Sequence, residues 1–591
     1  MKGQYMAMLA VLMLIITACE SDYLDKMPEA DGYDFDKVFK DSTNYLNYCE
    51  YLVINPFFLH LQNGVKPFGS WDDITDNSIS TPTFSGVPSV QAQQGNYYSL
   101  RTNGDAPMAN NTTWEQIWKH IRVANTGIRN ISHYPGGEKS RNKILGMCYF
   151  YRAFAYMDLT RRWGGMPYLF APIDASADMD FPRLSMQETY MLAAEDCDSA
   201  AMFLQDVIPE SEFQHPTRIA ALSLKSRILL YAASDQARNE NGNGVNLWEE
   251  AAIASDEAIK AAEDAGYSLV EWGASLNGDD GYHYLFKDND PTKYLTEIIL
   301  GRRAQINWGS DAYTNTVRPP GTLSGKYGVA ASQQLVDCFE MQSTGLPVGD
   351  PASGHVEQNP YKGRDPRFYF NILYNNATVM NRTLSIWQEE EGKGITGSPD
   401  CKITAQGIPD MGYTQTGYYA RKWMGKTWNA TLPQVWSYIR LAEVYLNFAE
   451  AANEAWGAPD TKHGQSRYSA AGAVNVVRSR AKMPDVHGKF MNQNDFRTRV
   501  RNERRVELCF EEHRLFDLRR WLIGTQPENR DIWMMKITKL AAGYNAAIYP
   551  TGFRFEKQLV MRRVYENRHN LFVIKLDDTR IGPNFKQNPG W

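Results

Sequence analysis

Helical periodicity constrains this chain of 591 residues more than any other feature, because it recurs in long segments that come in pairs. The first pair, near 114–163, joins "TTWEQIWKHIRVANTGIRNI" to "KILGMCYFYRAFAYMDLTRRWGG". The second of these segments is apolar almost all round, which predicts a buried helix that ends at Gly164 and Gly165. A second pair of helices is predicted near 185–235 by "SMQETYMLAAEDCDSAAMFL" and "TRIAALSLKSRILLYAAS".

A third periodic segment, 247–265, has no neighbouring partner. The matching segment, 435–457, comes much later, and a fourth pair is predicted over 469–521. Small Ala and Gly residues alternate with bulky aromatic residues at helical spacing, as they do in stacked tetratricopeptide-like helix pairs. The repeat spacing is irregular, so we expect a degenerate set. The predicted fold is mostly α, with about four helix pairs as its scaffold.

Long stretches between these helices have a different composition. Residues 53–107, 266–434 and 543–591 are rich in Gly, Pro, Asn, Asp and aromatic residues, with turn signals such as "NGDDG", "RPPG" and "TGSPD". We therefore expect long irregular loops and short strands that extend from the helical scaffold. Binding residues are usually found on such loops.

The N-terminus carries an export signal. Lys2 precedes an apolar run that ends at Thr17 and Ala18, which is the pattern of a signal peptide and too short to cross a bilayer comfortably. "ITAC" resembles the lipobox of bacterial lipoproteins, in which the cysteine becomes the acylated N-terminus. This predicts a signal peptide over 1–18, a lipid (diacylglycerol and palmitate) on Cys19, and a single mature domain over 19–591. The alternative is a chance Cys after a plain signal peptide.

Composition argues against several function classes. A formal net charge of -6 gives no general attraction to nucleic acid or anionic lipid. The six cysteines after Cys19 lie far apart, so we expect no zinc site and no obligatory disulfide. The ten His residues show no ligand spacing, and the "GDDG" turn at 278–281 lacks the calcium-loop pattern. Hydrolase and phosphate-loop motifs are missing, so we expect neither a metal nor a cofactor.

Glu503, Glu507 and Glu511 are the strongest candidates for catalytic carboxylates, because they follow one another at intervals of four residues. Paired carboxylates of this kind act as acid and base in glycosidases. The same spacing stacks them on one helix face among many Arg residues, where they would form ion pairs between packed helices. We interpret them as structural.

Aromatic residues in the predicted loops are the candidate ligand-binding residues. Sugars stack their C–H faces on Trp or Tyr, while Asp and Asn bind the hydroxyls. Trp71 and Trp308 are expected to converge on one face. The predicted site comprises Trp71, Asp72, Asp73, Asn77, Trp308, Tyr313 and Trp387. The alternative is that each aromatic side chain packs its own loop onto the scaffold.

Several motifs in fixed order resemble the SusD/RagB family of surface nutrient-binding lipoproteins, and the resemblance runs from Cys19 to Trp591. They are "CESDYLDKMP", "YFYRAFAYMDLTRRWGGMPY", "YKGRDPRFYFNILYN", "RLAEVYLNFAEAANEA", "AVNVVRSRAKMP", "RNERRVELCFEEHRLFDLRRW" and "QNPGW". Glu20 and Asp22 also resemble the surface-export signal of lipoproteins from Bacteroides-type bacteria. The resemblance implies four helix pairs with one irregular face. It also implies a partner, a TonB-dependent outer-membrane transporter of the SusC type.

The resulting hypothesis is a non-catalytic lipoprotein of the outer membrane, facing the cell exterior, that binds glycans and passes them to this transporter. A peptide-binding RagB-type member of the same family is the first alternative. A lipid-anchored glycoside hydrolase and a purely structural scaffold are the others. Nucleic acid is not an expected partner.

Overall fold

The computed structural model describes most of the chain after residue 34. The described residues are 35–54, 71–81, 87–97, 110–174, 176–240, 242–275, 281–286, 291–303, 319–325, 328–389, 397–404, 409–424, 435–486 and 491–591. The predicted signal peptide and Cys19 lie outside them, as do Trp308 and Tyr313.

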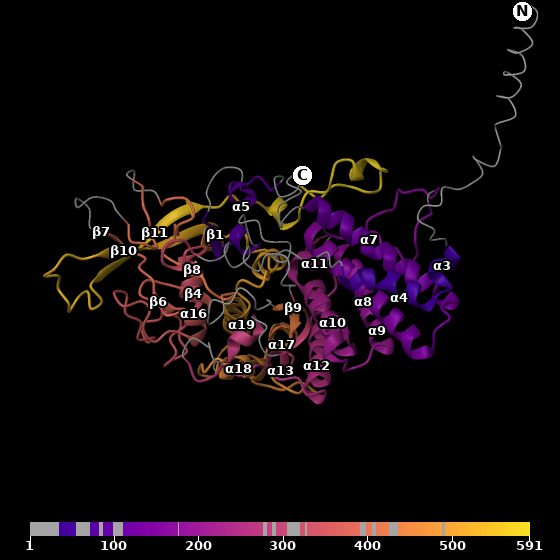
Figure 1. Ribbon diagram of the computed structural model, residues 1–591, viewed down its shortest axis with the longest axis horizontal. Coiled ribbons are helices and arrows are strands. Elements are labelled where there is room, and N and C mark those ends of the chain that lie inside the picture. Colours follow the sequence, from indigo (N-terminus) through magenta and orange to yellow (C-terminus); the bar gives the residue numbers. More distant parts are fainter. Residues whose placement is uncertain are drawn as a thin grey trace, which may run out of the picture.

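Helices that pack in sequence order form one half of the molecule, on the right of Figure 1. Helix α7 contacts α8, α8 contacts α9, α9 contacts α10, and α10 contacts α12. The bounds are α3 Phe35–Phe39, α4 Ser42–Ile54, α7 Asn110–Arg129, α8 Glu138–Trp163, α9 Met186–Phe203, α10 Arg218–Ala233 and α12 Trp248–Asp264. The predicted mostly helical fold is confirmed.

Local sequence explains where these helices begin and end. Helix α8 is buried along most of its length, as its uniform apolarity predicts. It ends at Gly164, whose φ of 85° is a conformation that glycine adopts without strain. Helix α9 begins with a capping box, in which the Ser185 hydroxyl and the Glu188 carboxylate each accept a backbone N–H of the first turn.

The third helix pair is completed by a distant segment. Helix α12 packs against α17 (Leu441–Trp456), as the periodicity predicts, but Val435–Arg440 of the segment predicted to be helical form strand β9, which corrects our prediction. Helix α17 also contacts α18 (Ala470–Arg480) and α19 (Gln493–Glu507). The predicted helix that ends near 521 is interrupted, which corrects our prediction. Phe510 and Glu512 have φ values of 60° and 66°, which an α-helix cannot contain. Helix α20 (Arg514–Arg520) follows this turn.

Short strands and helices fill the other half of the molecule, on the left of Figure 1. The antiparallel pairs are β1 Ser78–Ser80 with β3 Val329–Ala331, β2 Ile298–Arg303 with β9 Val435–Arg440, β4 Ile372–Leu373 with β8 Tyr419–Ala420, and β5 Thr378–Val379 with β6 Arg382–Thr383. A long hairpin pairs β10 Asp531–Lys539 with β11 Phe553–Arg562, and β7 Gln388–Glu389 joins β10 in parallel. Strand β11 lies in a region predicted to be irregular. The short helices are α5 Pro88–Gln93, α13 Pro291–Tyr294, α15 Gln333–Cys338, α16 Pro366–Asn371 and α21 Pro527–Arg530, while α11 Asp235–Asn239 contacts α9 and α10 in the helical half.

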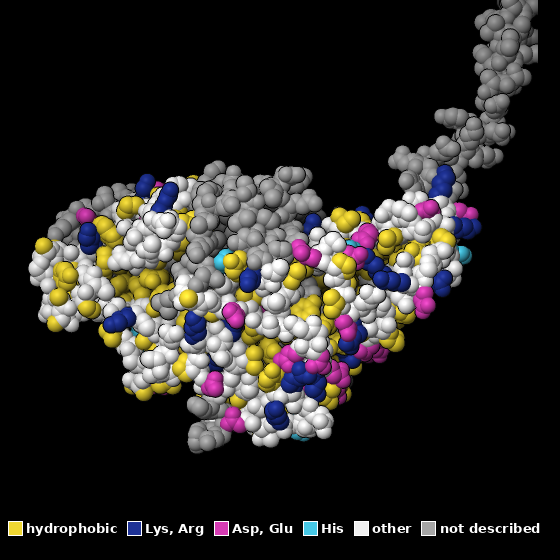
Figure 2. Space-filling view, turned by 60° about the horizontal axis from the view of Figure 1, so that its bottom comes forward, with side chains coloured by type: hydrophobic (Ala, Val, Ile, Leu, Met, Phe, Trp, Pro, Cys, Tyr) yellow, Lys and Arg dark blue, Asp and Glu magenta, His cyan; other side chains and the backbone are white. Residues whose placement is uncertain are grey.

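Two large hydrophobic clusters correspond to these two halves. The first lies between the helices, and the second lies under the strands and includes Tyr282, Phe286 and Phe370. On the face shown in Figure 2, Lys and Arg side chains are interspersed with Asp and Glu. Among the described residues, no helix is both long and apolar enough to cross a membrane.

Candidate functional site

The predicted ligand loop around Trp71 is buried. Helix η1 (Trp71–Ile74) contacts α5, α20 and β1. The Trp71 side chain is 1% exposed, and its ring centroid lies 5.5 Å from that of Phe572 and 6.2 Å from that of Phe516. The Arg162 guanidinium lies 5.1 Å from the same ring. Both faces of the indole are therefore inside the protein, and our prediction that Trp71 forms a stacking platform is corrected to the alternative, a core residue.

The polar neighbours of Trp71 bind one another rather than solvent. Asn77 Nδ2 donates to Asp72 Oδ1 at 2.7 Å, and Ser78 Oγ donates to Asp73 Oδ1 at 2.8 Å. Asp72, Asp73 and Asn77 are each at most 1% exposed. These three predicted ligand-binding residues instead close a tight turn, because Asp and Asn side chains readily hydrogen-bond to nearby groups.

The next acid in this loop connects it to a distant helix. Arg514 donates to both carboxylate oxygens of Asp76 at 2.8 Å, and the Arg505 guanidinium lies 2.9 Å from it. Burial alone would raise the pKa of Asp76, but Arg505 and Arg514 hold it well below its usual value. Asp76 is therefore a charged anchor for the loop.

Trp387 is half-buried and packs against the cluster under the strands. Its backbone N–H donates to Ser398 Oγ at 2.9 Å, and Lys539 Nζ lies 4.5 Å from its ring centroid. The lysine covers one face of this ring through a cation–π contact. The structure does not bring Trp387 together with Trp71, which belongs to the cluster between the helices.

The segment that carries Trp308 and Tyr313 follows β2, whose end is described. Arg302 and Trp436 are direct partners in the β2–β9 ladder, so their side chains share one face. Trp436 is half-buried and stacks on Trp423, with ring centroids 4.4 Å apart. Arg302 Nη1 also reaches the carbonyl of Ile54 at 3.4 Å. The end of α4, the end of β2 and the start of β9 therefore meet at one place.

We name Arg302, Trp436 and Tyr438 the seam group, because they lie where the two hydrophobic clusters meet. Trp436 packs against the cluster under the strands, and Tyr438, two residues further along β9 at an irregularity of the ladder, packs against the cluster between the helices. The indole, phenol and guanidinium of these three residues supply a stacking surface and hydrogen-bond donors. Our sequence analysis missed this group, although the β-branched and aromatic residues in "VWSYIR" are a strand signal.

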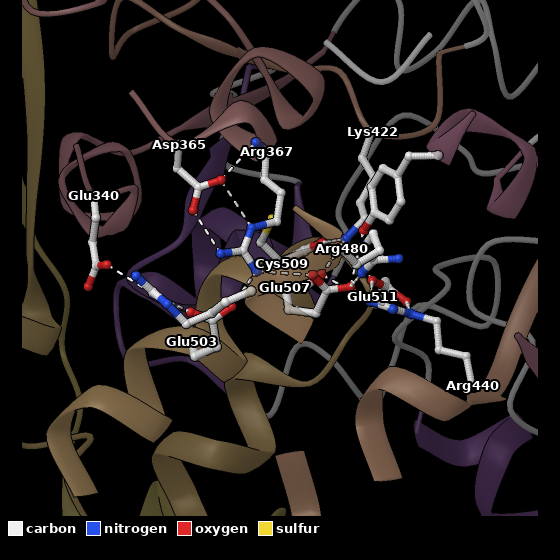
Figure 3. Close-up of polar contacts among 12 residues, drawn as sticks. Glu340, Asp365, Arg367, Lys422, Arg440, Arg480, Glu503, Glu507, Cys509 and Glu511 are labelled. Carbon is white, nitrogen blue, oxygen red and sulfur yellow. Dashed lines mark hydrogen bonds and ion pairs between the residues drawn. The ribbon is translucent and has the colours of Figure 1, made fainter. Parts of the chain in front are cut away.

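Glu503 and Glu507 on α19, together with Glu511 just after it, form ion pairs in the interior, which agrees with our structural interpretation (Figure 3). Glu503 accepts from Arg367 at 2.5 Å and from Arg478 at 2.8 Å. Glu511 lies in the turn after α19, and accepts from Lys422 Nζ at 2.6 Å and from Arg440 Nε at 2.8 Å.

Glu507 is the centre of this network. It accepts from Arg440 at 2.7 Å, from Arg480 at 2.5 Å and from Arg367 at 3.1 Å, and its side chain is 0% exposed. Burial alone would raise the pKa of Glu507, but Arg480, Arg440 and Arg367 hold it well below its usual value. A carboxylate that stays ionised and is closed to solvent has neither the proton nor the access that a general acid needs.

Burial raises the pKa of several other carboxyls, among them that of Asp72 to about 6 and that of Glu512 to about 8. Asp72 is 1% exposed, so this raised pKa reflects the low polarity of the interior. Among the described residues, no cluster of three or more His, Cys, Asp or Glu side chains has the geometry to hold a metal ion.

Comparison with known proteins identifies the fold and the family. Residues 296–591 match the model of the SusD family, and residues 62–230 match a model described as starch-binding associating with outer membrane. The chain belongs to the SusD family.

Relatives of known sequence support the same assignment. SusD-like protein P2 of Formosa agariphila is 24% identical over 72% of this chain and 74% of its own length. SusD-like protein P38 of the same organism is 32% identical over 21% of this chain and 24% of its own length. The chain therefore shares most of its length with P2 and a shorter segment with P38.

Solved SusD-family structures share the fold. A SusD-like protein from Bacteroides fragilis has a TM-score of 0.69 at 24% identity, covering 96% of this chain and 100% of that one. A laminarin-binding SusD-like protein has a TM-score of 0.58 at 18% identity, covering 93% and 99% of the two chains. At these identities the likeness establishes the arrangement of helices and strands.

Proposed function

We propose that this SusD-family chain is a non-catalytic lipoprotein of the outer membrane that binds oligosaccharides and passes them to a SusC-type TonB-dependent transporter. In this proposal a lipid on Cys19 holds the protein on the outer face of that membrane. The seam group is the observation that carries the ligand assignment, because a half-buried Trp436 lies beside Arg302 at the end of β2.

The ligand site combines the seam group with residues predicted from the sequence. Trp308 and Tyr313 belong to the segment that starts directly after Arg303, the last residue of β2. We propose that these two side chains stack on the sugar, while Arg302 donates to its hydroxyls. Trp387 is a secondary contact for a longer glycan. The non-catalytic assignment is supported by the closed, ionised carboxylates around Glu507.

Titration with an oligosaccharide panel that includes laminarin fragments tests the binding part of this proposal. Stacked aromatic side chains contribute about 1–3 kcal/mol per ring to ligand binding, so Trp436→Ala and Trp308→Ala should each weaken binding by about 5- to 150-fold. Trp533→Ala is the matched control, because Trp533 is 38% exposed on β10 and outside the seam group.

The outcomes separate this proposal from its alternatives. Binding of peptides but of no glycan would establish the RagB-type alternative. Glycan cleavage that disappears on substitution of a carboxylate would establish a hydrolase. Wild-type affinity in both Trp436→Ala and Trp308→Ala would show that the ligand binds elsewhere.

A further inference from the structure

Two of the six cysteines after Cys19 meet inside the helical half of the molecule. All six lie in the described part of the chain and are free thiols in the structure. Cys49 on α4 and Cys148 on α8 are 99 residues apart in the sequence, yet their sulfur atoms are only 3.8 Å apart. A contact between α4 and α8 therefore runs through a pair of thiols, which the spacing of the cysteines along the chain did not indicate.

The two sulfurs are closed to solvent. Both cysteines are fully buried and belong to the cluster between the helices. The hydrogen bond to the Cys148 thiol and the burial of the pair raise the pKa of Cys49 well above its usual value. The Cys49 thiol therefore stays protonated in the folded protein and is closed to reagents in solution.

A glycine in the neighbouring helix makes room for the sulfurs. Gly127 lies within α7, where glycine is a poor helix former and so has a packing reason to be present. A Cβ at this position would lie 2.7 Å from Sγ of Cys148 and 2.9 Å from Sγ of Cys49, which is closer than atoms in contact allow. The Tyr45 hydroxyl donates to the Gly127 carbonyl at 2.5 Å and holds this turn of α7 against α4. Three helices thus keep the two sulfurs side by side.

A covalent bond between these sulfurs needs only a small further approach. The sulfurs of a disulfide are about 2.05 Å apart, so this pair would close by about 1.8 Å. Helices α4 and α8 are already packed against each other, so rotation of the two side chains can supply this movement. Among the described residues, no other two cysteines have their sulfur atoms in contact.

The predicted export of the chain places this pair where disulfides form. Disulfides form and persist outside the cytoplasm, where thiol–disulfide oxidoreductases act as the oxidants. A pair of adjacent thiols in an exported protein therefore meets both requirements of a cross-link, which are proximity and an oxidant.

We propose that Cys49 and Cys148 form a disulfide in the exported protein, which joins α4 covalently to α8. The bond forms while the exported chain is still open, because the folded protein closes both thiols to an oxidant. One cysteine thiolate attacks the disulfide of an oxidoreductase and forms a mixed disulfide, and the other cysteine then displaces the oxidoreductase. The two thiols lose two protons and two electrons in total, and the oxidoreductase leaves as a dithiol. The inference rests on the proposed function, because it takes the export of the chain from there.

The cross-link strengthens the end of the chain that carries the proposed lipid. Helix α3 begins at Phe35, 16 residues after Cys19, and packs against α4, which in turn packs against α7 and α8 (Figure 1). A pull at the lipid anchor therefore reaches α3 and α4 first. A bond from α4 to the buried helix α8 transmits this force to the centre of the helical half.

Thiol labelling of the full lipidated chain tests the inference. Cells are quenched with acid so that no bond forms afterwards, and the protein from the membrane fraction is then alkylated in denaturant without reductant. We expect Cys49 and Cys148 to resist alkylation and to appear in mass spectrometry as one linked pair of peptides, while the other four cysteines are labelled. Reduction before alkylation should label all six. Alkylation of both Cys49 and Cys148 without reductant would overturn the inference.

Thermal melts measure what the bond contributes. A disulfide that closes a loop of this length should raise the melting temperature of a chain of this size by about 2–3 °C, so a reductant should lower it by the same amount. The reductant should have no effect on Cys49→Ala. Cys197→Ala is the matched control, because Cys197 is also buried but has no sulfur partner, and it should keep the wild-type response. An equal effect of the reductant on the wild type and on Cys49→Ala would contradict the cross-link.

Cell fractionation separates this inference from the proposed function. A chain found in the outer membrane with both thiols free would overturn the disulfide and leave the proposed function intact. A chain found in the cytoplasm with its signal peptide uncleaved and both thiols free would overturn the disulfide together with the export on which the proposed function depends.

Discussion

Replacing Glu507 with Ala should destabilise the protein without changing its ligand affinity. Glu507 accepts from Arg367, Arg440 and Arg480, and its side chain is 0% exposed. Removing one partner of a buried ion pair costs about 3–5 kcal/mol, because the remaining charge stays buried without compensation.

Other carboxylates remain beside the three arginines after Glu507 is removed, so the cost should lie at the low end of this range. Arg367 keeps Asp365 and Glu503, and both Arg440 and Arg480 keep Glu297. We therefore expect a loss of about 3 kcal/mol. Unfolding entropy of about 2.1 cal/mol/K per residue gives roughly 1.2 kcal/mol/K for a chain of this size, so the melting temperature should fall by about 2–3 °C.

Scanning calorimetry at pH 7 measures this shift, and Glu212→Ala provides the control. Glu212 pairs with Lys143 at 2.9 Å where the two side chains are 36% and 32% exposed, and such a pair contributes less than about 1 kcal/mol. The pKa of Glu507 is lower in the folded state than its unfolded value of 4.5. The ionised carboxylate therefore stabilises the fold fully above pH 4.5, and this stabilisation is lost as the pH falls from 4.5 toward the folded-state pKa. The difference in melting temperature between the wild type and Glu507→Ala should therefore become smaller at acidic pH. A Glu507→Ala variant that melts like the wild type but no longer binds glycan would refute the structural assignment.

Three further predictions concern other parts of the chain. Cys19→Ser should release the protein from membrane fractions, and unchanged fractionation would contradict the lipid anchor. Trp71→Ala should destabilise the protein by about 3–5 kcal/mol, because Trp71 is a full core residue, and a chemical-denaturation curve measures this loss. Burial raises the pKa of Glu512 to about 8, so wild-type stability should fall as the pH rises from 4.5 to 8, by at most about 1.4 kcal/mol per pH unit. Glu512→Gln should flatten that slope in melts across this pH range.

The sequence predicts the helical scaffold well, because each long helix carries its own periodic pattern. The distant partner of α12 is recognisable because α17 has a wide apolar stripe around Leu446 and Phe448. The break after α19 is not recognisable, since Phe510 and Glu512 are non-glycine residues with positive φ. Tertiary contacts impose that conformation, and nothing local marks it.

The binding residues are harder to predict, because loop composition does not reveal burial. Trp71, Asp72 and Asn77 look like an exposed polar turn, yet Arg505 and Arg514, more than 400 residues away, enclose the loop through Asp76. The opposite holds for Trp436, which lies in a segment predicted to be helical and becomes a site candidate only through its pairing with Arg302 in the β2–β9 ladder.

The separation between α12 and α17 has a consequence for how the protein is made. Helix α12 ends at Asp264 and α17 begins at Leu441. At about 5–20 residues per second, a ribosome needs roughly 10–35 s to synthesise the intervening chain. Helix α10 can pack against one side of α12 at once, but the side that contacts α17 is rich in Ala and has no partner during that interval. The third helix pair therefore closes only after α17 has been synthesised, when about three quarters of the chain is complete.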